Sequence, residues 1–152
     1  MKNTTLQSIN SIKNRPGVVV IEGHVQGLAN TRLLGQAGIP VIVIDKDNCV
    51  AMYSKYCKAF YKCPDYLSEE FIDFLIRLNK AFNLHNWLLL PSNDHAVYNI
   101  SQHKDTLSQY YKVITENIEV IENIYKDFKS DNFDFFQKYL YLELNLRLPE
   151  LL

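Results

Sequence analysis

Two short runs of β-branched residues, separated by one helical segment, constrain the fold of this chain more than any other feature. The runs are VVVIEG at residues 18–23 and VIVID at 41–45, and both have the composition of strands buried on two faces. Between them, residues 26–37 carry apolar side chains at helical spacing, and Gly38 follows as the expected helix C-cap. These apolar residues are Leu28, Ala29, Leu33, Leu34 and Ala37. A crossover of this length joins parallel strands, so the segment predicts a βαβ unit.

The same alternation continues along the chain. Further strands are predicted at 58–63, 87–91 and 111–115, and helices are predicted after Ser68, after Ser92 or Asn93, at 118–125 and at 131–144. Strands that alternate with helices predict an α/β fold: a Rossmann-like, doubly wound, mostly parallel five-stranded sheet with helices on both faces, in three layers. The expected division is a polar leader at 1–15, this domain at 16–127 and a C-terminal helix with the start of a linker at 128–152.

Charge and cysteine content narrow the class of protein. Sixteen Lys and Arg against seventeen Asp and Glu give a net charge of -1, which argues against a nucleic-acid partner. Three cysteines form neither a disulfide framework nor a pair of CxxC motifs, as expected for a reduced, cytoplasmic protein. The apolar runs are too short for a signal peptide or a membrane span, so no membrane partner is expected.

Two loops are the candidate binding site. Ligands of parallel sheets bind beyond the carboxyl ends of the strands, where the strand order reverses. With the order 3-2-1-4-5, the reversal lies between the first and fourth strands and is flanked by residues 22–27 and 91–95. The predicted substrate-binding residues are Gly23, His24, Gly27, Ser92, Asn93, Asp94 and His95.

Each of these residues also has an interpretation that needs no ligand. Gly23 and Gly27 form a GxxxG spacing, which is neither a dinucleotide fingerprint nor a Walker loop. The two glycines could admit a ligand to the N-terminus of the following helix, but a tight turn and close helix packing are the commoner reasons. Asp94 could orient a histidine or cap the next helix.

The remaining candidate residues do not form a complete catalytic or metal motif. His24 and His95 could face one another across the predicted crevice, yet no HExxH spacing accompanies them, so no metal site and no catalytic residue are predicted. Asp45 follows the glycines by about the distance at which dinucleotide folds place a ribose-binding acid. It is therefore a candidate cofactor-binding residue, although a solvated strand-end carboxylate is the simpler interpretation. Cys63 is expected to be part of the core.

Residues 16–150 resemble the N-terminal (pre-ATP-grasp) domain of ATP-grasp carboxylate–amine ligases, a group related to carbamoyl-phosphate synthase and D-aspartate ligase. The resemblance is carried by the run at 18–47, YSKYCKAFYKCPD at 53–65, PSNDHAV at 91–97, NIEVIENIYKD at 117–127 and LRLPEL at 146–151. Two positions depart from the family pattern. Glu22 stands where the family often has another Gly, and His95 stands where an acid is common.

The resemblance implies an activity for a larger protein. Such ligases use ATP and magnesium to phosphorylate a carboxylate, and an amine then attacks the acyl phosphate. ATP and Mg are held by the central and C-terminal ATP-grasp subdomains, while the N-terminal domain contributes to the acceptor-substrate side. The implied partners are a small-molecule carboxylate or amine and the ATP-grasp subdomains of the same polypeptide. The chain alone is expected to bind no cofactor and to be inactive.

Two other functions compete with this one. A Rossmann-type regulatory module would bind NAD or ATP, and a structural interaction domain would bind neither. The C-terminal segment at 133–148 is rich in Phe, Tyr and Leu, so the isolated chain is also expected to dimerise or aggregate through it.

Overall fold

The computed structural model describes residues 15–128, and these residues belong to two compact units whose boundary falls between Asn117 and Ile118. The first unit contains the sheet and the candidate loops. From the second unit, the structure describes helix α6 (Ile118–Phe128), in agreement with the short helix predicted there. The polar leader up to residue 14, the helix predicted at 131–144 and the apolar segment at 133–148 lie outside the described residues.

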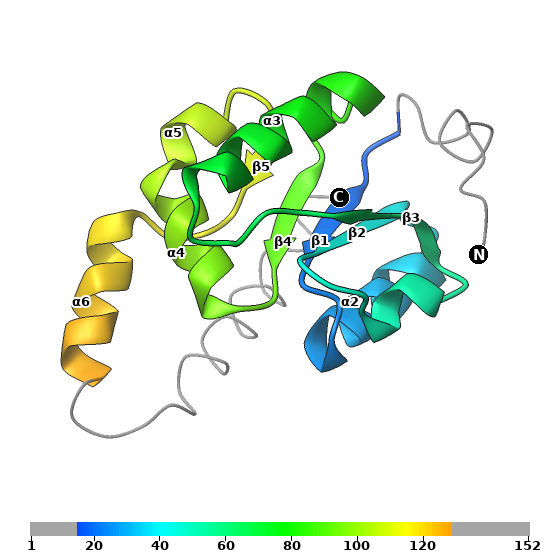
Figure 1. Ribbon diagram of the computed structural model, residues 1–152, viewed down its shortest axis with the longest axis horizontal. Coiled ribbons are helices and arrows are strands. Elements are labelled where there is room, and N and C mark those ends of the chain that lie inside the picture. Colours follow the sequence, from blue (N-terminus) through cyan, green and yellow to red (C-terminus); the bar gives the residue numbers. More distant parts are fainter. Residues whose placement is uncertain (1–14, 129–152) are drawn as a thin grey trace. The chain divides into compact units, whose positions relative to one another are not determined.

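The first unit is built on a five-stranded, all-parallel sheet with the strand order β3-β2-β1-β4-β5 (Figure 1). Its strands are β1 (Val18–Ile21), β2 (Val41–Asp45), β3 (Cys57–Lys62), β4 (Leu88–Pro91) and β5 (Lys112–Val113). β2 has the predicted bounds, whereas β5 is shorter than the predicted 111–115 and β1 ends two residues early. The predicted order and the parallel pairing are confirmed.

Helices cover both faces of this sheet, which confirms the three-layer, Rossmann-like α/β fold. On one face lie α2 (Val25–Gln36) and a 3-10 helix, η1 (Val50–Tyr53). On the other lie α3 (Glu69–Phe82), α4 (Asp94–Gln102) and α5 (Lys104–Leu107), as Figure 1 shows. The patterns did not predict η1, because four residues are too few to display a period. No helix in residues 15–128 has the length and apolar character needed to cross a membrane.

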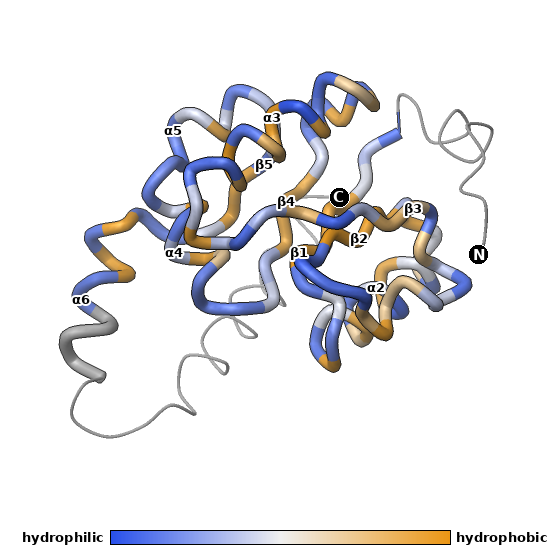
Figure 2. The backbone as a smooth tube through the Cα atoms, viewed as in Figure 1, coloured by the Kyte–Doolittle hydropathy of each residue, from blue (hydrophilic) through white to orange (hydrophobic). Residues whose placement is uncertain are grey.

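The core consists of the buried strands and the inner faces of the helices, and Figure 2 shows the hydrophobic residues concentrated along β1, β2 and β4. Alternate residues of the strands serve opposite faces. Val19, Ile21, Ile42, Ile44 and Leu89 share one cluster with Phe71, Leu75 and Ile100 from α3 and α4. The single tryptophan, Trp87, is 2% exposed and belongs to the same cluster.

The apolar residues that the sequence places at helical spacing do not all belong to the buried face of α2. The helix buries Gly27, Thr31 and Leu34, whereas Leu33 is 57% exposed. The reason is close packing: a Cβ at Gly27 would overlap the Glu22 carbonyl oxygen, and one at Gly35 would overlap the Tyr56 side chain. α2 therefore approaches its neighbours through its small residues, and larger apolar residues such as Leu33 remain outside.

Candidate functional site

The two candidate loops begin where the strand order reverses, between β1 and β4. We call residues 22–27 and 91–95 together the reversal site. Backbone hydrogen bonds attach both loops to the sheet: the Glu22 N–H donates to the Ile44 carbonyl at 2.9 Å, and the Ser92 N–H donates to the Ile21 carbonyl at 2.9 Å. The strand order thus brings the two loops with the seven predicted residues side by side, at the carboxyl ends of β1 and β4.

The two glycines of the reversal site have packing roles. A Cβ at Gly27 would overlap the backbone of Glu22, so α2 could not begin where it does. A Cβ at Gly23 would overlap the Cys49 sulfur and would lie 3.0 Å from the Ala51 Cβ. These contacts account for the GxxxG spacing by packing, and the ligand-binding role of either glycine stays a prediction.

Glu22 is a residue of the reversal site that sequence reasoning missed. Its φ is 71°, a left-handed conformation that costs a non-glycine residue free energy, and its side chain is half-buried. Burial raises the pKa of Glu22, and the nearby carboxylates of Asp45 and Asp94 raise it too, while His24 and a hydrogen bond with the Asn93 side chain lower it. The sequence offered one signal for this residue: Glu22 stands where the family that the motifs resemble often has a glycine.

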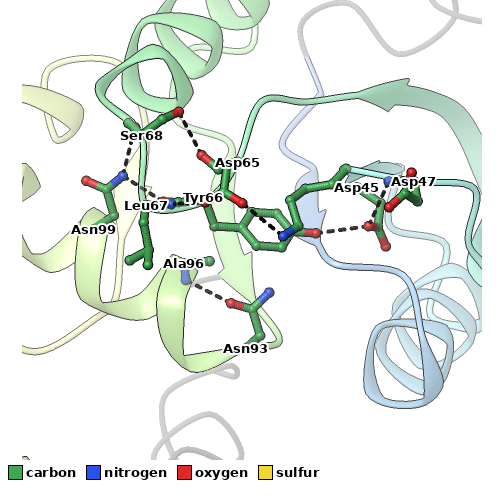
Figure 3. A network of polar contacts seen from close by, with 10 residues as sticks. Asp45, Asp47, Asp65, Tyr66, Leu67, Ser68, Asn93, Ala96 and Asn99 are labelled. Atoms are coloured by element: carbon green, nitrogen blue, oxygen red, sulfur yellow. Dashed lines mark hydrogen bonds and ion pairs between the residues drawn. The ribbon is translucent and has the colours of Figure 1, made fainter.

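Asp45 is not the solvated carboxylate that the sequence favoured. The residue is 3% exposed, and its oxygens accept hydrogen bonds from the Gly23 N–H at 2.8 Å, the Tyr66 hydroxyl at 3.0 Å and the Asp47 N–H at 3.3 Å. His24 Nε2 lies 3.9 Å from Asp45 Oδ2. Figure 3 shows the contact with Tyr66. Because both oxygens already accept from the protein, Asp45 holds the β1–α2 loop, and its cofactor-binding role stays a prediction without support.

The β4–α4 loop starts helix α4. Asn93 is the N-cap, with its side-chain oxygen accepting from the Ala96 N–H at 2.8 Å (Figure 3), so one of the two predicted caps is confirmed. Asp94 is the first residue of the helix and not its cap, which corrects the alternative interpretation of this acid. Burial raises the pKa of Asp94, and His95 opposes the rise.

Two more contacts complete the description of the site. Ser92 is 7% exposed, and its hydroxyl accepts from the Asn30 amide at 3.5 Å, a partner from α2 that the sequence did not indicate. The side chain of His24 is 57% exposed, and His95 is exposed as well. The prediction that these two histidines face one another stays a prediction.

The charged groups of the site are mainly acidic. Glu22 and Asp94 carry the carboxylates of the two loops, Asp45 contacts the first loop at Gly23, and neither loop contains Lys or Arg. The site therefore offers hydrogen-bond acceptors and negative charge, which suit a ligand with N–H donors. Within residues 15–128, no group of three His, Cys, Asp or Glu side chains is placed to hold a metal ion. Burial raises the pKa of the Cys63 thiol to about 12, and this residue is 8% exposed, as expected for core.

No protein-family model matches the chain, and neither a curated protein nor a solved structure matches it significantly. The relationship to ATP-grasp ligases stays a prediction from the sequence motifs, and these comparisons do not support it.

Proposed function

We propose that this chain is the substrate-side domain of an ATP-dependent carboxylate–amine ligase that works through an acyl phosphate. The observation that carries the proposal is the strand order. It brings together the two loops that contain family-like motifs, EGHVQGL and PSNDHAV, at the reversal between β1 and β4. Parallel α/β sheets place their ligands at such a reversal.

The chemistry of the site favours an amine over a nucleotide. A phosphate site needs free backbone N–H groups or cationic side chains. Here Glu22 and Asp94 place carboxylates at the site, Asn93 already takes the Ala96 N–H, and the Gly23 N–H is already bound by Asp45. Because neither loop contains Lys or Arg, we assign ATP and Mg²⁺ to ATP-grasp subdomains of the same polypeptide.

The contribution of this domain is to bind and orient the acceptor amine. Carboxylates beside an amine accept its N–H donors and fix its direction, and a fixed direction lowers the barrier to attack on an activated carbonyl. We assign no catalytic residue to the chain, because the group that phosphorylates the carboxylate is expected outside it.

Equilibrium titration tests the proposal. The chain is titrated with a panel of amino acids and simple amines, and in parallel with ATP and Mg²⁺. We expect saturable binding of at least one amine and no binding of ATP. Asp94→Asn should weaken amine binding by about tenfold, the loss expected for one charged hydrogen bond. Asp105→Asn is the control, because Asp105 also lies in the first turn of a helix but is exposed and outside the reversal site.

Two results would contradict the proposal. Saturable binding of ATP or NAD, with no amine bound, would identify a nucleotide-binding regulatory module. Equal losses from Asp94→Asn and Asp105→Asn would show that any amine binding is unspecific. Attached to ATP-grasp subdomains, the chain should support ADP formation that depends on both a carboxylate and an amine.

A further inference from the structure

Tyr66 belongs to neither loop of the reversal site, yet it contacts a residue next to each loop: Asp45 at the end of β2 and Asn99 in α4. It is 4% exposed and sits in the β3–α3 loop, residues 63–68. Its hydroxyl donates to Asp45 Oδ1 at 3.0 Å, and its backbone carbonyl accepts from the Asn99 amide at 2.7 Å (Figure 3). One residue thus contacts the end of β2 through its side chain and α4 through its backbone.

Each of these contacts continues to one loop of the site. Asp45 uses its other oxygen, Oδ2, to hold the Gly23 N–H at 2.8 Å, which fixes the β1–α2 loop. Asn99 lies in α4, the helix whose N-terminus is capped by Asn93 of the second loop. A continuous series of hydrogen bonds therefore runs from Gly23 through Asp45 and Tyr66 to Asn99. We call this series the Tyr66 bridge.

The surroundings of Tyr66 leave its ring little freedom. The ring meets Phe71 edge to face, with centroids 5.6 Å apart and planes at 87°. Lys46 Nζ lies 5.1 Å from the ring centroid and pairs with Asp65 at 3.0 Å. Asp65 also accepts from the Leu67 N–H at 3.0 Å, which shapes the turn that carries Tyr66. A ring held in this way can transmit the position of α4 to Asp45.

We propose that Tyr66 is a positioning residue for the reversal site: through the Tyr66 bridge it sets the place of the β1–α2 loop relative to α4. The proposal rests on the proposed function only for the statement that a ligand binds there. Tyr66 itself need not touch that ligand. A purely structural Tyr66 would stabilise the domain as a whole without a particular effect on Gly23.

The test compares Tyr66→Phe with Tyr111→Phe. Tyr111 is a matched control because it is 2% exposed and its hydroxyl donates one buried hydrogen bond, to the Leu75 carbonyl at 2.8 Å. Hydrogen exchange of the Gly23 amide is measured by NMR, and that of the core amide of Leu89 is measured beside it to report any global loss of stability separately. We expect Tyr66→Phe to speed Gly23 exchange by about tenfold, the effect of one hydrogen bond to a carboxylate, and Tyr111→Phe to leave it unchanged.

A second variant approaches the bridge from its other end. Asn99→Ala removes the two donations from the Asn99 amide to the Tyr66 and Ser68 carbonyls, at 2.7 and 3.1 Å. It should also speed Gly23 exchange, although Asn99 lies in α4 and reaches Gly23 only through Tyr66 and Asp45. This variant decides the matter if Tyr66→Phe does not fold. Gly23 exchange that equals the Tyr111→Phe value in the folded variants would overturn the proposal.

Ligand titration separates this proposal from the proposed function. In a chain that binds an amine from the panel, Tyr66→Phe should weaken that binding more than Tyr111→Phe does, and equal affinities would overturn the positioning role. If the unaltered chain binds no member of the panel, the proposed function fails, while the exchange data still decide whether the Tyr66 bridge positions the loop.

Discussion

Glu22 provides the sharpest test of how this chain builds the reversal site, because its backbone conformation is costly for the residue that occupies it. At φ 71° an L-residue is disfavoured by about 1–2 kcal/mol. Glycine avoids this cost but loses about 0.4–1 kcal/mol more chain entropy on folding. Glu22→Gly and Glu22→Ala both delete the carboxylate, so their comparison isolates the backbone. The glycine variant should be more stable than the alanine variant by about 1 kcal/mol.

Urea unfolding measures this difference directly. The single tryptophan, Trp87, is 2% exposed in the core and reports unfolding by its fluorescence. A difference of 1 kcal/mol corresponds to about 3 °C in Tm for a domain of this size. Glu70 is the control: it is exposed in the first turn of α3, where Ala should be more stable than Gly by up to about 1 kcal/mol.

The difference in unfolding free energy between the glycine and alanine variants should therefore have opposite signs at Glu22 and at Glu70. An alanine variant at Glu22 that equals or exceeds the glycine variant would refute the conclusion that this position carries left-handed strain.

Three other predictions concern stability. Gly27→Ala should lower the unfolding free energy by at least about 2 kcal/mol, because its Cβ would overlap the Glu22 backbone; an unchanged urea midpoint would contradict the close approach. Ser101→Ala should raise it by about 1 kcal/mol, since the Ser101 hydroxyl is buried in α4 without a hydrogen-bond partner in the described part of the chain; a loss of stability would reveal a partner. Burial raises the pKa of Glu22 above 4.5, so the folded state binds the Glu22 proton more tightly than the unfolded state does. The free energy of unfolding should therefore fall as the pH rises from 4.5 and Glu22 loses its proton. In urea unfolding at several pH values, Glu22→Gln should reduce the dependence of the unfolding free energy on pH. An unchanged dependence on pH would show that Glu22 is not its source.

The central strands of the sheet could be predicted from the sequence because they consist almost entirely of apolar residues. β2 consists of four β-branched residues after Pro40 and ends at Asp45, so its bounds matched the prediction. The strand order was assumed from the doubly wound fold class, and the structure has this order. The apolar face of α2 was not predictable in the same way, because glycine contacts and not apolar periodicity decide which side of that helix is buried.

The site was predictable only in its location. Position in the sequence placed the two loops at the reversal, but Asp45 contacts Tyr66 across 21 positions and Asn99 contacts Tyr66 across 33. Such partners become visible only when the β3–α3 loop is placed over the sheet. The conformation of Glu22 was hidden for a related reason, since propensity does not predict a left-handed glutamate at a strand end.

Amide chemical shifts measured while an amine panel is titrated into the chain test the central claim most directly, because they show where a ligand binds as well as whether it binds. We predict that a binding amine shifts Gly23, His24, Asn93 and Asp94 together, with one saturation curve, and that ATP with Mg²⁺ shifts none of them. Shifts confined to other elements, shifts caused by ATP, or no response to any amine would contradict a substrate site at the reversal between β1 and β4.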